Sequence, residues 1–301
     1  MSFDVGQEGP PGPEGAYPHG PAPDGSAGDP ADVLTAADAP LFEDSVVPRY
    51  LSFFGGLVAE MLIPTESAQI AHVACRTGYP DPIVAEKLPR CHIWGVDGSG
   101  PAIDVARAKA SLFSDAQTSY LVHPGMPTPL HEGAFTHAFS VHPVAGAAAR
   151  AALLAELRRV LVPGGQALLA LPLRGSFPEI NDMVREFALR QDLPDLSQAV
   201  DVAAQSRPTI ETISEELENA GLTEIDVDVQ LIAVSFNDGR EFLEDPIARL
   251  LVFPEMRVLL ALDKDLGATC FQYVQDAISK YWSEGVFELT VNVGCASGRR
   301  F

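Results

Sequence analysis

One stretch of the chain, residues 69–110, constrains the fold more than any other. It opens with an apolar run at Ile70–Val73, which ends in a tight turn. We expect a helix to begin at Asp81-Pro82, because a carboxylate suits the N-cap and proline suits the first helical position. A second apolar run, Ile93–Val96, ends in Asp97. This order predicts a βαβ unit that holds a nucleoside at the turn, with Asp97 accepting hydrogen bonds from the ribose hydroxyls.

The same stretch resembles motifs I and II of the class I S-adenosylmethionine-dependent methyltransferases. In that family an acid lies in the first strand and three alternating glycines form the turn. Here His72 stands at the position of the acid. Ala74 and Arg76 stand at the first two glycines, and Gly78 keeps the third. The resemblance implies an α/β fold with a doubly wound, seven-stranded, Rossmann-like sheet, an antiparallel last strand and a helical cap or lid. It also implies S-adenosyl-L-methionine as the cofactor, with Asp97 as the ribose-binding acid.

Two later segments extend this resemblance. Residues 123–146 resemble the family's stretch from the adenine loop through the fourth strand, without an acid near Pro124. An amphipathic helix, a Pro163-Gly164-Gly165 turn and an apolar strand then follow in the order common to small-molecule members. We expect both glycines to adopt positive φ and to have a structural role only.

The resemblance assigns the cofactor site to His72, Ala74, Cys75, Arg76, Thr77, Gly78, Asp97, Gly98, Gly125, Met126 and Ser140. Arg76 either pairs with the methionine carboxylate, disfavours the sulfonium, or points to solvent. No catalytic residue is assigned, because the cofactor brings its own leaving group and methyl transfer needs mainly alignment. His142, at the carboxyl end of the expected fourth strand, is the best candidate for a base or substrate contact. The alternative is an ordinary loop histidine.

Charge restricts the partners of this chain. Its 41 acidic and 20 basic residues give a net charge of −21. Such a surface repels phosphate backbones and anionic lipid, which argues against nucleic-acid and membrane partners. We therefore expect a small or medium neutral acceptor. No apolar stretch is long enough for a transmembrane helix, and the first residues do not resemble a secretory signal.

Cysteine and histidine spacing predict no metal site. The four cysteines lack CxxC spacing and are expected to be buried thiols of a cytoplasmic protein. Six of the seven histidines fall between His72 and His142. In the expected strand order, however, His123 and His142 end strands about 14 Å apart, too far to share an ion.

Composition divides the chain into three parts. Residues 1–40 are rich in proline, glycine and acids without lysine or arginine, so we expect a disordered tail. The tail is either a solubilising extension or a docking element for a protein partner. Residues 41–66 should form a helical cap and 67–301 a methyltransferase-like domain. Its helical insertion, 238–284, is expected either to form a lid at the ligand edge or to pack behind the sheet.

Two functions remain open on this reading. The first is S-adenosylmethionine-dependent methyl transfer to a small or medium neutral acceptor. The alternative is a catalytically degenerate methyltransferase-fold protein that acts as a regulatory or interaction module. A nicotinamide dehydrogenase is a distant third, because no GxGxxG turn follows the first strand.

Overall fold

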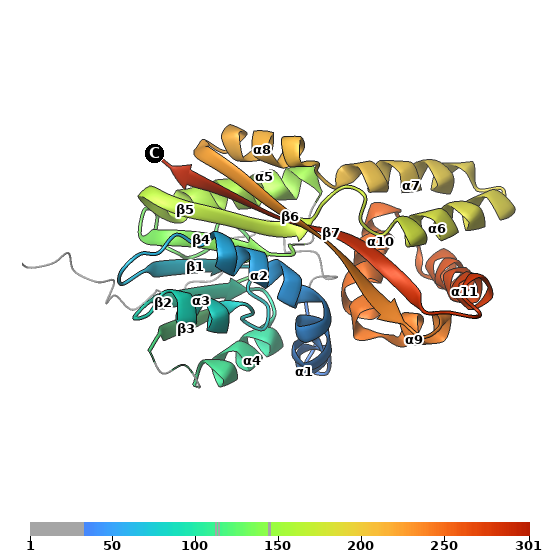
Figure 1. Cartoon of the computed structure of the whole chain (residues 1–301), viewed down its shortest axis with the longest axis horizontal. Coiled ribbons are helices and arrows are strands. Elements are labelled where there is room, and N and C mark those ends of the chain that lie inside the picture. Colours follow the sequence, from blue (N-terminus) through green and yellow to red (C-terminus); the bar gives the residue numbers. More distant parts are fainter. Residues whose placement is uncertain (1–32, 112, 114, 144–145) are drawn as a thin grey trace, which may run out of the picture.

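The computed structural model describes residues 33–111, 113, 115–143 and 146–301, and its centre is a seven-stranded sheet (Figure 1). The strands are β1 (Gln69–Val73), β2 (His92–Asp97), β3 (Gln117–Val122), β4 (Phe135–Val141), β5 (Leu161–Pro172), β6 (Leu222–Phe236) and β7 (Phe287–Arg300). Their order is β3-β2-β1-β4-β5-β7-β6. β1 to β5 run parallel, whereas β7 is antiparallel to both neighbours. The predicted doubly wound sheet with an antiparallel last strand is confirmed.

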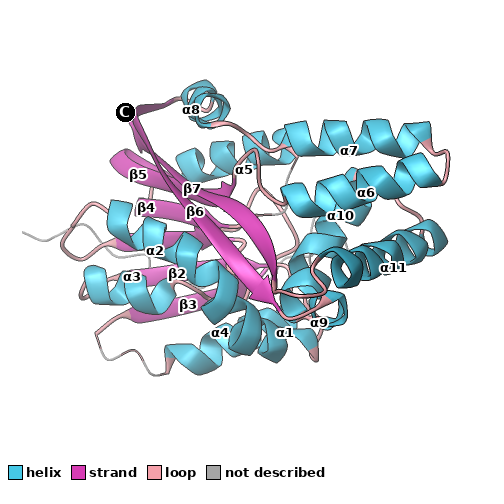
Figure 2. Cartoon of the chain, turned by 45° about the vertical axis from the view of Figure 1, so that its right-hand side comes forward, coloured by secondary structure: helices cyan, strands magenta, loops and turns pink. Residues whose placement is uncertain are grey.

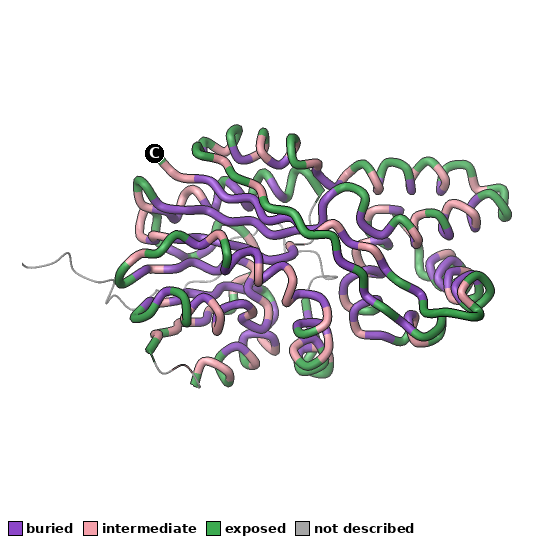
Figure 3. Tube along the Cα trace, in the orientation of Figure 1, coloured by how far each residue is buried: buried purple, intermediate pink, exposed green. Residues whose placement is uncertain are grey.

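Helices cover both faces of the sheet (Figures 1 and 2). On one face lie α5 (Ala147–Val160) and α8 (Ile210–Asn219), and on the other lie α3 (Asp81–Lys87) and α4 (Gly100–Ala110). Successive residues of β1 point to opposite faces, as in any strand. Ile70 joins the apolar core on the α3 side, and Ala71 joins the core on the α5 side. The strands β1, β2, β4 and β5 are consequently buried along most of their length, whereas β3, at the edge of the sheet, is mostly not (Figure 3).

The N-terminal cap is one continuous helical segment that begins earlier than predicted. It consists of α1 (Asp38–Leu41), η2 (Phe42–Leu51) and α2 (Ser52–Met61). The cap was predicted to begin at residue 41, whereas the helical segment begins at Asp38, and Pro48 lies inside its π-helical stretch. Proline has no N–H to donate, and a widened turn around it is a recognised way for a helix to continue. Leu34 is buried too, so the folded part begins before residue 41; of the predicted tail, residues 1–32 lie outside the described residues.

A second group of helices lies beyond the carboxyl ends of the parallel strands (Figure 1). It comprises α6 (Pro178–Arg190), α7 (Pro194–Ser206), α9 (Gly239–Glu244), η3 (Ala248–Val252), α10 (Phe253–Leu259) and α11 (Lys264–Tyr281). The long strands β6 and β7 extend into this group, where Phe236 and Phe287 pack with Phe242. The predicted insertion 238–284 is therefore on the ligand side of the sheet, although its role as a lid stays a prediction. Among the described residues, no helix has the length and apolar character needed to cross a membrane.

One expectation about the Pro163-Gly164-Gly165 turn, which lies near the start of β5, is half wrong. Gly164 has φ +79°, as predicted for a position that favours glycine. Gly165 does not have a positive φ; a Cβ there would lie 2.9 Å from the carbonyl oxygen of Val162. Close approach of the backbone, rather than handedness, is what glycine provides at this second position.

Candidate cofactor and acceptor site

The turn after β1 keeps the backbone of a glycine-rich motif with only one glycine. Ala74, Arg76 and Gly78 have φ values of +56°, +45° and +76°, so all three are left-handed. These are the three positions at which the family has glycine. For a residue with a Cβ, the left-handed conformation costs of order 1–3 kcal/mol and persists only when its surroundings impose it. The shape of the motif has therefore been retained although two of its glycines have been replaced.

A buried network under the turn compensates for the missing acid. His72 Nδ1 lies 2.7 Å from Asp81 Oδ1, and the Tyr120 hydroxyl donates to Asp81 Oδ2 at 2.6 Å. Burial, followed by the charge of Asp81, raises the pKa of Tyr120 and keeps it protonated. The expectation that Asp81 caps α3 is wrong: the N-cap is Pro80, without a side-chain cap. Asp81 instead supplies from the helix the carboxylate that the strand lacks.

Asp97 joins the ends of β1 and β2 through two backbone amides. Its Oδ2 accepts from the amide of Arg76 and its Oδ1 from the amide of Ser99, both at 2.8 Å. Each carboxylate oxygen keeps a further lone pair, so both can still accept from hydroxyl groups. Above this carboxylate, the Ser99 hydroxyl donates to the backbone oxygen of Leu34 at 2.6 Å. The binding of ribose by Asp97 stays a prediction, and the cap lies directly beside the residue that would perform it.

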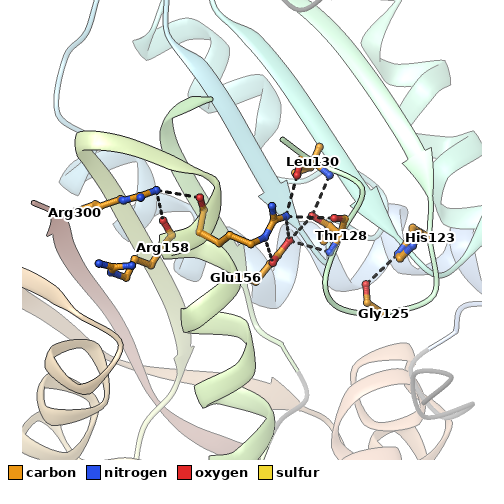
Figure 4. Close-up of polar contacts among 8 residues, drawn as sticks. His123, Gly125, Thr128, Leu130, Glu156, Arg158 and Arg300 are labelled. Atoms are coloured by element: carbon orange, nitrogen blue, oxygen red, sulfur yellow. Dashed lines mark hydrogen bonds and ion pairs between the residues drawn. The ribbon is translucent and has the colours of Figure 1, made fainter. Parts of the chain in front are cut away.

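The loop after β3, which contains Gly125 and Met126, is held by α5 (Figure 4). Both the amide and the hydroxyl of Thr128 donate to Glu156, and Arg159 donates to the same carboxylate at 2.7 Å. Burial acts to raise the pKa of Glu156, but hydrogen bonds from Arg159 and Thr128 outweigh it and lower the pKa. This anchor could not be predicted from the sequence, since Glu156 lies on a helix with no motif of its own.

His142 meets a residue that sequence reasoning missed. Its Nε2 lies 3.0 Å from the hydroxyl of Tyr50 on η2, and both side chains are buried. Phe54 packs edge-on against the His142 ring at 5.1 Å between ring centroids. Burial first, and then the positive charge of Arg76, lowers the pKa of His142 to about 3. The imidazole is therefore neutral in the working range of pH.

Two small cavities lie on either side of this histidine–tyrosine pair. The first, about 10 Å³, is lined by Phe42, Leu51, Ala74, Cys75, Arg76, Thr77, Tyr79 and Val141. The second, about 20 Å³, is lined by His142, Pro143, Arg150, Leu171, Pro172, Arg207, Pro208 and Glu255. Leu51 and Val141, the chain neighbours of Tyr50 and His142, face the first cavity, while His142 itself faces the second. The strand edge is thus divided into a side next to the motif turn and a side next to β5.

The residues of the first cavity fit a nucleoside-bearing cofactor, but the space is closed by the cap. Thr77 Oγ1 and Arg76 Nη1 are buried without a hydrogen-bond partner, a condition that a polar ligand would relieve. Ser140 Oγ is unpartnered too, but Ser140 does not line this cavity. The side chain of Phe42 covers Arg76, with the guanidinium carbon 5.5 Å from the ring centroid. A volume of about 10 Å³ holds at most one water, so the cap must move before a cofactor can enter.

The predicted site residues separate into two groups. Ala74, Cys75, Arg76 and Thr77 line the first cavity, and Gly78 and Asp97 shape the turn. His72 instead uses its Nδ1 on Asp81 and stacks on Phe139. Gly98 approaches the His123–Pro124 backbone, while Met126 is 39% exposed on the loop. Among the described residues, no three His, Cys, Asp or Glu side chains gather as a metal site.

Comparisons with known proteins agree with this architecture. Residues 71–169 match a family model described as a methyltransferase domain, and no curated protein matches the chain. Phosphoethanolamine N-methyltransferase 2 of Haemonchus contortus, solved with S-adenosyl-L-methionine, is 15% identical with a TM-score of 0.53 over 88% of this chain and 57% of that one. A putative methyltransferase of Bacillus halodurans is also 15% identical, with a TM-score of 0.52 over 83% of this chain and 99% of that one. This chain thus spans little more than half of the Haemonchus enzyme. Residues 71–169 match the methyltransferase-domain model, and the fold of the chain is similar to that of the class I S-adenosylmethionine-dependent methyltransferases.

Proposed function

We propose that this protein transfers a methyl group from S-adenosyl-L-methionine to a small or medium acceptor. One observation carries the proposal: three left-handed residues in alternation keep the turn open, with Asp97 hydrogen-bonded beneath it. When bound, the cofactor supplies the activated methyl group. The turn from Ala74 to Gly78 and the carboxylate of Asp97 would hold it, together with the loop that contains Gly125 and Met126. Thr77, which lines the cavity at the turn, offers it an unpartnered hydroxyl group.

The chain's own contribution to the reaction is alignment and exclusion of water. Orienting two reactants can supply roughly 7–11 kcal/mol of barrier reduction without any acid or base. The cap provides the enclosure, since Phe42, Tyr50 and Phe54 are fully buried over the carboxyl ends of β1 and β4. His142 and Tyr50, both uncharged, form the wall between the cofactor side and the side next to β5. This arrangement supports a reaction between two bound molecules in a dry enclosure.

A second candidate function is favoured by the side chain of Arg76. The guanidinium lies where a cofactor would approach the turn, and the remaining cavity is about 10 Å³. A permanently closed cap would make this a catalytically degenerate methyltransferase-fold protein that acts as a regulatory or interaction module. A docking role for the acidic tail would suit that function, but the tail lies almost entirely outside the described residues.

Calorimetric titration of the full chain with S-adenosyl-L-methionine and S-adenosyl-L-homocysteine separates the two functions. Methyl transfer requires that both bind, with micromolar affinity and a heat capacity change that reports movement of the cap. If neither compound binds at millimolar concentration, the proposal of methyl transfer fails and the degenerate module is favoured. The net charge of −21 predicted a neutral acceptor. That prediction rests on the average surface, whereas the acceptor meets the residues around His142.

A further inference from the structure

We propose that the cavity at the carboxyl ends of β4 and β5 binds an anionic group of the methyl acceptor, a carboxylate or a phosphate, between His142 and Arg207. This inference rests on the proposed methyl transfer, because it identifies the cavity as the acceptor side of that site. The cavity lies next to β5, and the Tyr50–His142 pair separates it from the motif turn. Its other walls come from Pro208, which precedes α8, and from Glu255 on α10.

Two guanidinium groups line this cavity, although the chain as a whole is strongly acidic. Arg207 pairs with Glu255 at 2.9 Å, and Arg150 pairs with Glu216 at 2.7 Å. A third guanidinium, that of Arg76, acts electrostatically on His142 from the cofactor side. Each guanidinium that lines the cavity is thus paired with one carboxylate, and Arg76 adds positive potential from the other side of the Tyr50–His142 pair.

Two unpartnered donors converge on the same cavity. Arg207 Nε is buried without a hydrogen-bond partner, and a guanidinium nitrogen can only donate. His142 Nδ1 is also buried and unpartnered. When the Tyr50 hydroxyl donates to Nε2, the neutral ring carries its hydrogen on Nδ1, so this atom is a donor as well. An oxyanion would satisfy both donors, whereas an apolar group would leave both buried and unsatisfied.

Packing fixes the position of the Arg207 guanidinium beside the cavity. The guanidinium carbon of Arg207 lies 4.7 Å from the centroid of the Phe177 ring, and its Nη2 is fixed by Glu255. A planar, positioned guanidinium loses little conformational freedom when it binds an oxyanion. The cavity holds about one water in this structure, so the segments that line it must move apart before the acceptor can enter.

The inference is tested with simple probes on the full chain. Benzoate, inorganic phosphate and the uncharged benzamide are titrated by calorimetry at fixed ionic strength, with and without saturating S-adenosyl-L-homocysteine. We expect at least one anion to bind and benzamide to bind more weakly by roughly tenfold or more. Binding of benzoate alone identifies a carboxylate, and binding of phosphate alone identifies a phosphate. Each probe is titrated to about 50 mM, because small probes bind weakly. The inference is overturned if benzoate and benzamide bind equally well, or if neither anion binds at that concentration.

Variants of the arginine locate the binding. Arg207→Gln should weaken the binding of the anion by roughly tenfold or more, because it removes a charged hydrogen-bond donor. The double variant R207Q/E255Q should do the same while leaving no unpaired carboxylate, which protects the test against misfolding. Arg240→Gln removes a 75% exposed arginine from the same part of the protein and should change nothing. If the folded double variant binds the anion as tightly as the parent, the site is elsewhere.

The same titrations distinguish this inference from the function on which it rests. If the parent protein binds S-adenosyl-L-homocysteine but does not prefer the anions to benzamide, the proposed acceptor site is wrong and the proposal of methyl transfer is unaffected. Absent binding of S-adenosyl-L-homocysteine in the parent protein overturns methyl transfer itself. In the arginine variants we expect the affinity for S-adenosyl-L-homocysteine to be unchanged, because Arg207 does not line the cavity at the motif turn.

Discussion

The motif turn and the cavity next to β5 lie at neighbouring strand ends, yet they are specified in different ways. The turn is a backbone structure from one short stretch, and its left-handed residues persist although Ala74 and Arg76 have replaced glycine. The cavity is a side-chain structure assembled from four distant segments, represented by His142, Leu171, Arg207 and Glu255. A backbone motif can survive substitution because its neighbours impose the conformation. A side-chain site depends on each residue that forms it.

The network beneath the turn offers the strongest way to break this comparison. Asp81→Ala removes the acceptor of both His72 and Tyr120, and each buried group left unsatisfied costs roughly 1–3 kcal/mol. We expect the free energy of unfolding to fall by about 2–6 kcal/mol, measured by urea denaturation. Asp104→Ala is the control, because its carboxylate is 75% exposed and should contribute less than about 1 kcal/mol. Equal losses in the two variants would show that the turn does not depend on its buried support.

Asp97 links the shape of the turn to ligand binding. Asp97→Ala should make the binding free energy of S-adenosyl-L-homocysteine less favourable by about 1.5–3 kcal/mol, the range for a hydrogen bond to a charged group. Calorimetry on the folded variant measures this effect, with circular dichroism to verify the fold. An unchanged dissociation constant would leave Asp97 as a structural link between Arg76 and Ser99 only.

Exchange of the arginine in the turn sharpens the comparison further. Arg76→Gly removes left-handed strain and empties the space under Phe42, so we expect tighter binding of S-adenosyl-L-homocysteine. Stability should rise by about 1 kcal/mol, since relieved strain exceeds the added unfolded-state entropy. Arg90→Gly is a matched control: Arg90 has φ +60° and does not line the cavity, so it should gain stability alone. Weaker binding in Arg76→Gly would instead show that the guanidinium holds the methionine carboxylate.

The smallest expected effect is at the wall between the two cavities. Tyr50→Phe removes only the hydroxyl that contacts His142, and the net value of one hydrogen bond is about 1 kcal/mol. Thermal unfolding measures this loss. Tyr79→Phe, which removes a longer contact of 3.4 Å to the backbone of Ser52, should cost less. If the two variants are indistinguishable, the Tyr50–His142 contact adds no stability to the wall.

The fold could be predicted because its signals are local. An apolar run, a turn and an acid within residues 69–97 fix the central βαβ unit, and element order then fixes the strand order. The support of the site could not be predicted in this way. Asp81 looked like a helix cap because sequence spacing cannot show that Tyr120, two strands from β1, reaches the same carboxylate. Tyr50 and Glu156 carry no motif, and their partners are 92 and 28 residues away in the chain.

If Asp97 binds a nucleoside as predicted, the hydrogen bond from Ser99 to the backbone of Leu34 would make residues 33–37 a tethered competitor for that ligand. Such a segment is present at a fixed effective concentration, which dilution of the protein does not change. The apparent affinity for the cofactor is then the intrinsic affinity multiplied by the fraction of molecules in which the segment has been released. By thermodynamic reciprocity, a bound cofactor must loosen the segment to the same extent that the segment opposes the cofactor. The release of residues 33–37 would thus signal, at the protein surface, that a ligand occupies the buried site.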